Sequence, residues 1–230
     1  MTKVKWPCGC ELPVKHALGA DMVVNVNFGD TLPKGIELDV YSMNLKCEAT
    51  WDMICSGRTN GVFQLESALG RQWAKKLEPR NIQELGALGA LIRPGCLRAM
   101  SGNPPKSMTQ RYCDRKHGVE EISYPHESLE PILKNTQGVL TFQEQAMKIA
   151  VVLAGFDAQQ ADILRKAIGK KNAAVMHNLK RSFLDGAKDT GIIGEELAEE
   201  IFGWIQESQR YSFNKSHADA YALNGYWSAF

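Results

Sequence analysis

A change in hydrophobic periodicity near residue 60 restricts the fold more than any other feature of this sequence. Before it, residues 22–28 and 36–41 form short runs in which apolar and polar residues alternate, which is typical of half-buried strands. After it, apolar side chains recur every four residues, as in Leu65, Leu69 and Trp73, which is the spacing of one helix face. We therefore expect a mainly α (α+β) fold.

The expected division is a small mixed N-terminal segment over residues 1–60 and a helical domain over residues 61–230. Thr50 is a candidate N-cap for a first helix over residues 50–54. Residues 100–110 are rich in Gly, Pro and Asn and predict a loop. Further helices are expected over residues 65–78, 81–92, 111–117, 129–133, 141–154, 157–168, 176–187 and 195–207.

Composition and charge exclude some classes of protein. No apolar run approaches the roughly 20 residues that a membrane helix needs, and the basic N-terminus is not followed by the apolar stretch of a secretory signal. We expect a cytoplasmic protein with no membrane partner. The formal net charge is +1, so the chain as a whole is not strongly attracted to nucleic acid. The charge is uneven, however, because residues 162–188 hold seven Lys or Arg against two Asp residues.

Four cations in this basic block are candidates for an anion site: Arg165, Lys166, Lys170 and Lys171. Gly169 is expected to break the helix and let the chain turn between them. Cations this close repel one another unless an anion lies between them, and a triphosphate or a DNA backbone has the required charge. The alternative is a solvated turn.

A second candidate site lies in residues 211–217, where aromatic, amide, cationic and imidazole groups are concentrated. Tyr211 or Phe213 is suited to stacking on a base, and Lys215 and His217 to contacting phosphate. The alternative is a buried aromatic pair beside a polar turn. Arg93 is a weaker candidate, because it follows a buried helix whose end could project its side chain into a cleft.

A small basic face is also expected on the helix that holds Arg111, Arg115, Lys116 and His117. Motifs of other enzyme classes are missing. The sequence has no phosphate-binding P-loop, no Gly-x-Ser-x-Gly elbow and no His-Glu-x-x-His pair. Hydrolase chemistry therefore has little support.

The six cysteines leave two interpretations open. Cys8 and Cys10 with His16 nearby suggest a metal site, although Cys-x-Cys is not the usual spacing of a zinc knuckle. The second half of such a site would have to come from Cys47 and Cys55. The alternative is ordinary reduced cysteines, since disulfides are rare without secretion.

Seven motifs, in the same order, resemble one family, the alpha subunit of bacterial DNA polymerase III, a C-family replicative polymerase. The resemblance covers the chain from about Asp52 to Tyr226, and the first 50 residues match poorly. The motifs are Gly61–Ser67, Leu88–Gly95, Asp114–Gly118, Tyr124–Leu129, Gln143–Gln145, Ala161–Lys171 and Phe213–His217.

The resemblance implies the fingers region, which grips the incoming deoxynucleotide and the template near the primer end. It implies that nucleotide is bound by Arg165, Lys166, Lys170, Lys171, Tyr211, Asn214, Lys215 and His217. It also implies that DNA is contacted by Arg93, Arg115 and Lys116. No metal site is expected among these residues.

Catalysis in this family depends on three palm aspartates that hold the metal ions, and two of them form an Asp-x-Asp motif. This sequence contains no Asp-x-Asp. Asp39, in Leu38-Asp39-Val40, is a possible counterpart of the third, although Glu37 replaces the usual basic neighbour. Two-metal phosphoryl transfer needs such carboxylates. We therefore expect Mg²⁺ to be bound mainly outside this chain, and the chain alone to be inactive.

The expected partners are primer–template DNA, a deoxynucleoside triphosphate, and a palm-bearing polypeptide or other replisome subunits. Cys8-Gly9-Cys10 and Thr50-Trp51-Asp52 are similar to phage-type members. The apolar run at residues 226–230 ends without a cap, so we expect a truncated or split polymerase. One alternative is a non-catalytic DNA-binding or polymerase-accessory module with the same fold. Another is the product of a decayed gene.

Overall fold

The computed structural model describes residues 3–6, 8–16, 23–25, 37–38, 40–101, 104–170, 173–208 and 212–230. Three predicted site residues, Asp39, Lys171 and Tyr211, lie outside the described residues. No helix among the described residues is both long enough and apolar enough to cross a membrane.

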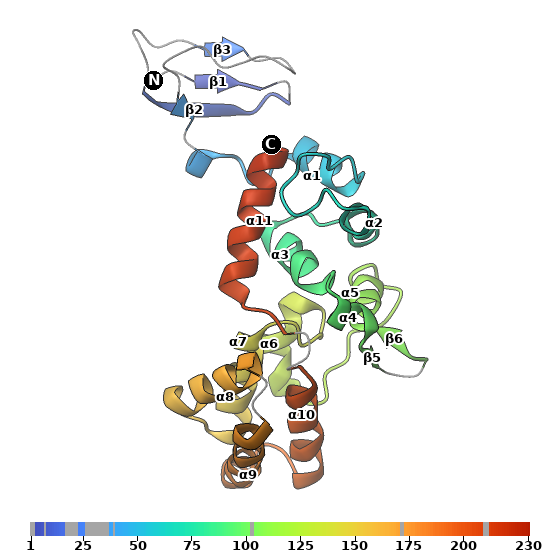
Figure 1. The fold of residues 1–230 in the computed structure, drawn as a ribbon, viewed down its shortest axis with the longest axis vertical. Coiled ribbons are helices and arrows are strands. Elements are labelled where there is room, and N and C mark those ends of the chain that lie inside the picture. The colour runs from blue at the N-terminus through green and yellow to red at the C-terminus, as the bar shows by residue number, and fades with distance from the viewer. Residues whose placement is uncertain are drawn as a thin grey trace. The chain divides into compact units, whose positions relative to one another are not determined.

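The chain forms two compact units (Figure 1), and their boundaries differ from the division expected at residue 60. The first unit contains residues 1–82 together with residues 223–230, and the second contains residues 83–222. The difference arises because the end of the last helix packs with the first helices, which local sequence patterns do not report. The mainly α prediction is confirmed, with a small mixed portion near the N-terminus.

The first unit begins with a small mixed sheet in the order β3-β1-β2-β4. β1 pairs antiparallel with β2 and parallel with β3, and β2 pairs antiparallel with β4. The strands expected in residues 22–28 and 36–41 are thus present, but the second gives way to a 3-10 turn. The elements of this unit are β1 (Lys3–Lys5), β2 (Glu11–His16), β3 (Val23–Asn25), β4 (Glu37–Leu38), η1 (Val40–Ser42), α1 (Glu48–Cys55) and α2 (Ala68–Leu77).

The helices of the first unit begin differently from the predictions. α1 is preceded by Cys47 at its N-cap, and Thr50 is buried inside the helix. α2 begins after Ser67, whose hydroxyl accepts a hydrogen bond from Gly70 N at 3.0 Å. Leu65 lies before this helix and Leu69 is exposed, so the expected four-residue face is only partly correct.

The second unit is helical apart from a two-stranded sheet. That sheet replaces part of the loop expected over residues 100–110, and α5 begins earlier than predicted because Ser107 caps it. The elements are α3 (Ile82–Leu91), α4 (Pro94–Arg98), β5 (Met100–Ser101), β6 (Lys106–Ser107), α5 (Met108–Lys116), η2 (Glu127–Leu129), α6 (Glu130–Leu133), η3 (Lys134–Thr136), α7 (Gln143–Ala154), α8 (Ala158–Lys170), α9 (Ala173–Thr190), α10 (Glu195–Ser208) and α11 (Lys215–Ala229).

The core of the second unit is built around α7, which packs against α8 and α9, while α10 packs against α9 (Figure 1). Ile149 and Leu153 of α7 are fully buried, as are Phe183 of α9 and Phe202 of α10. The last two rings lie 5.4 Å apart between centroids. This core holds the N-terminus of α7 and the helix that carries the basic block.

Gly169 does not end α8, contrary to the prediction, because the helix continues through it to Lys170. The side of α8 at Gly169 faces the side chain of Gln143, whose Nε2 would lie 3.7 Å from a Cβ built at that position. Gly169 therefore lies within a helix rather than at a turn, and a Cβ there would make only an ordinary contact. The predicted cap of α8 is correct, since Asp157 Oδ1 accepts from Gln160 N at 2.7 Å.

Candidate functional site

The basic block on α8 contains its own counter-ion. Asp162 pairs with Arg165 at 2.8 Å and with Lys166 at 2.7 Å, one helical turn away in each case. Hydrogen bonds from Lys166 and then Arg165 hold the pKa of the Asp162 carboxyl below its usual value. The repulsion that suggested a bound anion is thus partly balanced inside the helix. One net positive charge remains on this turn, and Lys170 adds another at the exposed end of α8.

The end of this basic helix lies beside the second candidate segment. Gly169 approaches the side chain of Gln143, and Gln143 N donates to Phe213 O at 2.9 Å. Phe213 N in turn donates to Thr141 O at 3.1 Å, which forms a short parallel bridge between the two segments. The fold therefore brings together two clusters that are more than 40 residues apart in sequence.

Glu144 fixes the start of α11. Its two carboxylate oxygens accept from Asn214 Nδ2 at 2.8 Å and from Lys215 N at 2.9 Å. Asn214 Oδ1 accepts from His217 N at 2.9 Å and so caps the helix. Lys215 pairs with Asp219 one turn later at 2.8 Å. Asn214 is thus used for positioning, and Lys215 has an internal counter-ion.

An aromatic column runs along the first turns of α11. The guanidinium of Arg93 lies 3.8 Å from the centre of the Phe213 ring. Phe213 meets His217 edge to face at 5.3 Å, and His217 lies 4.0 Å from Tyr221. Arg93, His217 and Tyr221 are exposed. The structure therefore joins Arg93, predicted separately as a DNA contact, to the segment predicted to bind nucleotide.

A polar atom without a partner lies in the same segment. The hydroxyl of Ser212 is buried, and no hydrogen-bond partner for it is present in the described part of the chain. Buried hydroxyls normally have a partner.

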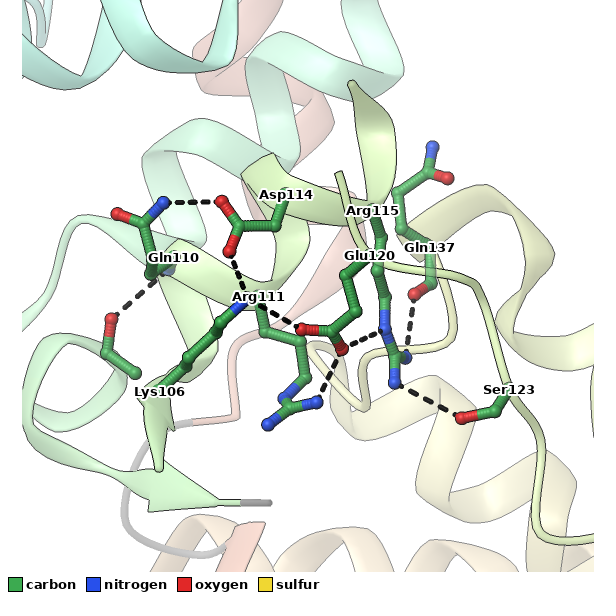
Figure 2. Close-up of polar contacts among 9 residues, drawn as sticks. Lys106, Gln110, Arg111, Asp114, Arg115, Glu120, Ser123 and Gln137 are labelled. Atoms are coloured by element: carbon green, nitrogen blue, oxygen red, sulfur yellow. Dashed lines mark hydrogen bonds and ion pairs between the residues drawn. The ribbon is translucent and has the colours of Figure 1, made fainter. Parts of the chain in front are cut away.

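The remaining two predicted DNA contacts, Arg115 and Lys116, lie on α5, and Figure 2 shows the cluster of polar contacts to which Arg115 belongs. Arg115 donates to Glu120 at 2.9 Å, to Gln137 O at 3.1 Å and to Ser123 Oγ at 3.4 Å. Its side chain is only 7% exposed. Arg115 therefore ties α5 to two loops, and its guanidinium is already engaged by these partners. Its contact with DNA stays a prediction.

Glu120 is the centre of this cluster. It pairs with Arg115, with Arg111 and with Lys106, and Lys106 also pairs with Asp114 at 2.6 Å. Burial raises the pKa of Glu120, but hydrogen bonds from Arg115 and Lys106 outweigh it and lower the pKa overall. The bond from Lys106 is also the largest cause of the lowered pKa of Asp114. The cations of α5 thus have internal counter-ions.

Lys116 also has an internal counter-ion. Its ammonium group pairs with Glu84 of α3 at 2.8 Å, and its side chain is 13% exposed. A DNA contact by this residue would have to compete with that ion pair.

Sequence reasoning quoted Gln143, Glu144 and Gln145 as a motif but assigned them no role. Gln145 is buried and its amide bridges three segments: it accepts from Phe142 N at 2.9 Å and donates to Thr136 Oγ1 at 2.7 Å and to Ile132 O at 3.2 Å. Three polar residues at the predicted start of a helix were the signal that could have identified this positioning group.

The described residues offer no carboxylate site for Mg²⁺. Among them, the only group of three or more Cys, His, Asp or Glu side chains close enough to share an ion consists of three cysteines. Mg²⁺ prefers oxygen ligands, so the described residues do not fit a resident Mg²⁺. Asp39 lies outside the described residues.

Comparison with known sequences gives a consistent result. The sequence model described as "Bacterial DNA polymerase III alpha subunit finger domain" matches residues 27–191. This match begins earlier and ends earlier than the predicted range from Asp52 to Tyr226, so the poor match expected for the first 50 residues is wrong from residue 27 onward.

The chain is also similar to complete subunits. It is 40% identical over 196 residues to DNA polymerase III subunit alpha of Aquifex aeolicus (strain VF5). The aligned region covers 85% of this chain and 16% of that protein. It is 42% identical over 194 residues to the Escherichia coli (strain K12) subunit, covering 82% and 16%. The Staphylococcus epidermidis (strain ATCC 12228) subunit is 38% identical over 191 residues, covering 83% and 17%. The chain thus spans about a sixth of the length of these relatives.

Proposed function

Because the chain belongs to the finger-domain family of the bacterial DNA polymerase III alpha subunit, we propose that it binds an incoming deoxynucleoside triphosphate and primer–template DNA during template-directed DNA synthesis. The observation that carries the proposal is that the end of the basic helix α8, at Gly169, lies near Gln143, whose backbone N–H bonds to Phe213 O. The basic helix and the segment with aromatic and polar groups are thus neighbours in the second unit.

The triphosphate is assigned to the cations of α8. Arg165 offers a planar fork for phosphate oxygens, while Lys166 and Lys170 offer mobile point charges. Asp162 holds the first two side chains until phosphate competes for them. We retain Lys171 in this set from the family resemblance.

The base and the DNA are assigned to the aromatic column. His217 and Tyr221 are exposed and pack ring against ring, so we assign base stacking to this pair. Arg93, held on Phe213, is placed to contact a phosphate or the edge of a base. Tyr211 is retained as a stacking residue, and Lys215 as a phosphate contact that would leave Asp219. Asn214 positions this segment rather than binding nucleotide itself.

Phosphoryl transfer requires carboxylates that the described residues do not supply. We propose that a palm-bearing polypeptide provides them with bound Mg²⁺, with Asp39 as a possible additional ligand, and that the chain alone does not extend a primer. We place the protein in the cytoplasm, as a part of the replication machinery.

The test is a salt titration of labelled primer–template DNA by fluorescence anisotropy, with and without the matching deoxynucleotide. Lys170→Ala is expected to lower the salt slope by about one unit, because one phosphate contact is lost. Lys188→Ala is the matched control, since it removes the same charge from an exposed position on α9. His217→Ala is expected to weaken the tightening caused by nucleotide.

Two results would contradict the proposal. If Lys170→Ala and Lys188→Ala lower the salt slope of DNA binding equally, DNA binding is a general property of the basic surface. DNA binding that does not respond to nucleotide would instead support a non-catalytic DNA-binding or polymerase-accessory module.

A further inference from the structure

Three thiols converge in the first unit, away from the residues assigned to nucleotide. Cys8 and Cys10 lie in the turn between β1 and β2, and Cys47 is the N-cap residue of α1. Their three sulfur atoms all lie within 4.8 Å of one another. All three are free thiols, and their burial increases from exposed Cys8 through Cys10 to buried Cys47. The turn and the start of the helix therefore place three sulfur atoms close together.

We propose that Cys8, Cys10 and Cys47 bind one Zn²⁺ ion, with solvent in the fourth position. Sulfur ligands at about 2.3 Å from a tetrahedral zinc ion lie about 3.8 Å apart. The observed spacing needs a shift of about 1 Å or less for each sulfur to reach that geometry. Thiolate ligands select a soft cation such as zinc over Mg²⁺. The exposed side of Cys8 gives the ion a route of entry.

The turn that carries two of the ligands is preformed. Trp6 N donates to Cys10 O at 2.9 Å, and Gly9 N donates to Trp6 O at 2.8 Å. Gly9 has a φ of +86°, which a residue with a Cβ adopts only with strain. Both cysteine side chains are thereby presented from one tight turn.

Hydrogen bonds hold Cys10 and the backbone of Cys47 in place. Asn44 Nδ2 approaches Cys10 Sγ at 3.8 Å, and Cys47 N donates to the Tyr226 hydroxyl at 3.2 Å. That hydroxyl donates to Asn44 O at 2.7 Å, and its ring packs on Trp51 at 4.7 Å. Such outer contacts orient metal ligands and are typical of built metal sites.

The structure also changes the ligand set that sequence spacing suggested. Cys55 does not join the cluster, because its thiol donates to Pro79 O at 3.3 Å. Cys8 and Cys10 precede residue 27, where the match to the finger-domain family begins. The site is thus formed by a segment outside the family match and one residue within it.

The test uses the full chain, purified with a thiol reductant and dialysed against metal-free buffer. Zinc is measured by plasma mass spectrometry, and we expect about one Zn²⁺ per chain. Cys8→Ser and Cys10→Ser are expected to reduce this to about a tenth or less. Cys55→Ser is the matched control and is expected to retain zinc, because serine can keep the bond to Pro79 O.

Co²⁺ provides a second readout that does not depend on how well each variant folds. Replacement of zinc by Co²⁺ in the unmodified chain is expected to produce a thiolate-to-cobalt charge-transfer band and the intense visible bands of a tetrahedral site. A reduced chain that binds neither added Zn²⁺ nor Co²⁺ would overturn the proposal. Full retention of zinc by the Cys8→Ser and Cys10→Ser variants would also overturn it. A disulfide between Cys8 and Cys10 that forms whether or not zinc is present would overturn it as well.

Discussion

Gly186 is the position where the packing of the second unit is most sensitive to one added methyl group. It lies on α9 against the C-terminal end of α7. A Cβ built there would overlap the carbonyl oxygen of Ala154 and lie 3.0 Å from the carbonyl carbon. Both atoms are backbone, so no side-chain rotation relieves the overlap. Gly186→Ala must therefore separate the two helices or bend one of them.

The expected cost follows from two opposing effects. Alanine is favoured over glycine inside a helix by about 1 kcal/mol. Overpacking of a closely packed core costs about 1–3 kcal/mol or more, and backbone contact places this site at or above the upper end. Moving α9 would also stretch the bond from Thr190 Oγ1 to Leu153 O, which is 2.6 Å long. We expect a net loss of about 2 kcal/mol, which lowers Tm by about 4–8 °C in a chain of this size.

Gly203→Ala is the matched control. Gly203 lies inside α10, and a Cβ built there has no atom within 4 Å outside its own helix. This variant is expected to gain about 0.5–1 kcal/mol. Thermal and urea unfolding followed by circular dichroism would measure both. If Gly186→Ala is as stable as Gly203→Ala, the close approach of α7 and α9 does not exist and the reasoning fails.

Three further predictions concern the polar groups. Glu120→Gln is expected to destabilise the fold by about 2–3 kcal/mol, because Arg115 is left buried without its counter-ion. Glu121→Gln, at the exposed neighbouring position, should change stability by less than about 0.5 kcal/mol. Urea unfolding of both variants measures the difference. The pKa values of Glu120 and Asp114 are lowered in the folded state. The stability that these carboxylates add to the fold is therefore complete above the unfolded values of 4.5 and 3.8, and it is lost as pH falls below them. A Glu120→Gln variant whose acid unfolding curve matches that of the unmodified chain would contradict this. Asn214→Ala is expected to cost about 1 kcal/mol through the lost helix cap and to reduce the effect of nucleotide on DNA affinity. Asn214→Ser, which keeps a capping oxygen and places no second carboxylate beside Glu144, should restore part of the stability.

The sequence by itself determined features that depend on neighbours in the chain. Gly155, in the left-handed conformation with φ of +63°, ends α7 as predicted, and Asp157 caps α8. These are contacts within one helical turn, so their energetics are readable from spacing alone. The pairing of Asp162 with Lys166 is of the same kind, and the i,i+4 spacing could have revealed it.

Tertiary structure decided which residues share a site. The sequence gives no indication that Gly169 lies inside a helix against Gln143, or that Arg93 stacks on Phe213. Sequence spacing suggested that Cys47 and Cys55 would both join Cys8 and Cys10. In the fold, Cys47 lies with them and Cys55 does not. These contacts join segments that are distant along the chain, so their partners depend on how whole helices pack to bury apolar surface. Local pattern selects the helices, and packing between them selects the contacts.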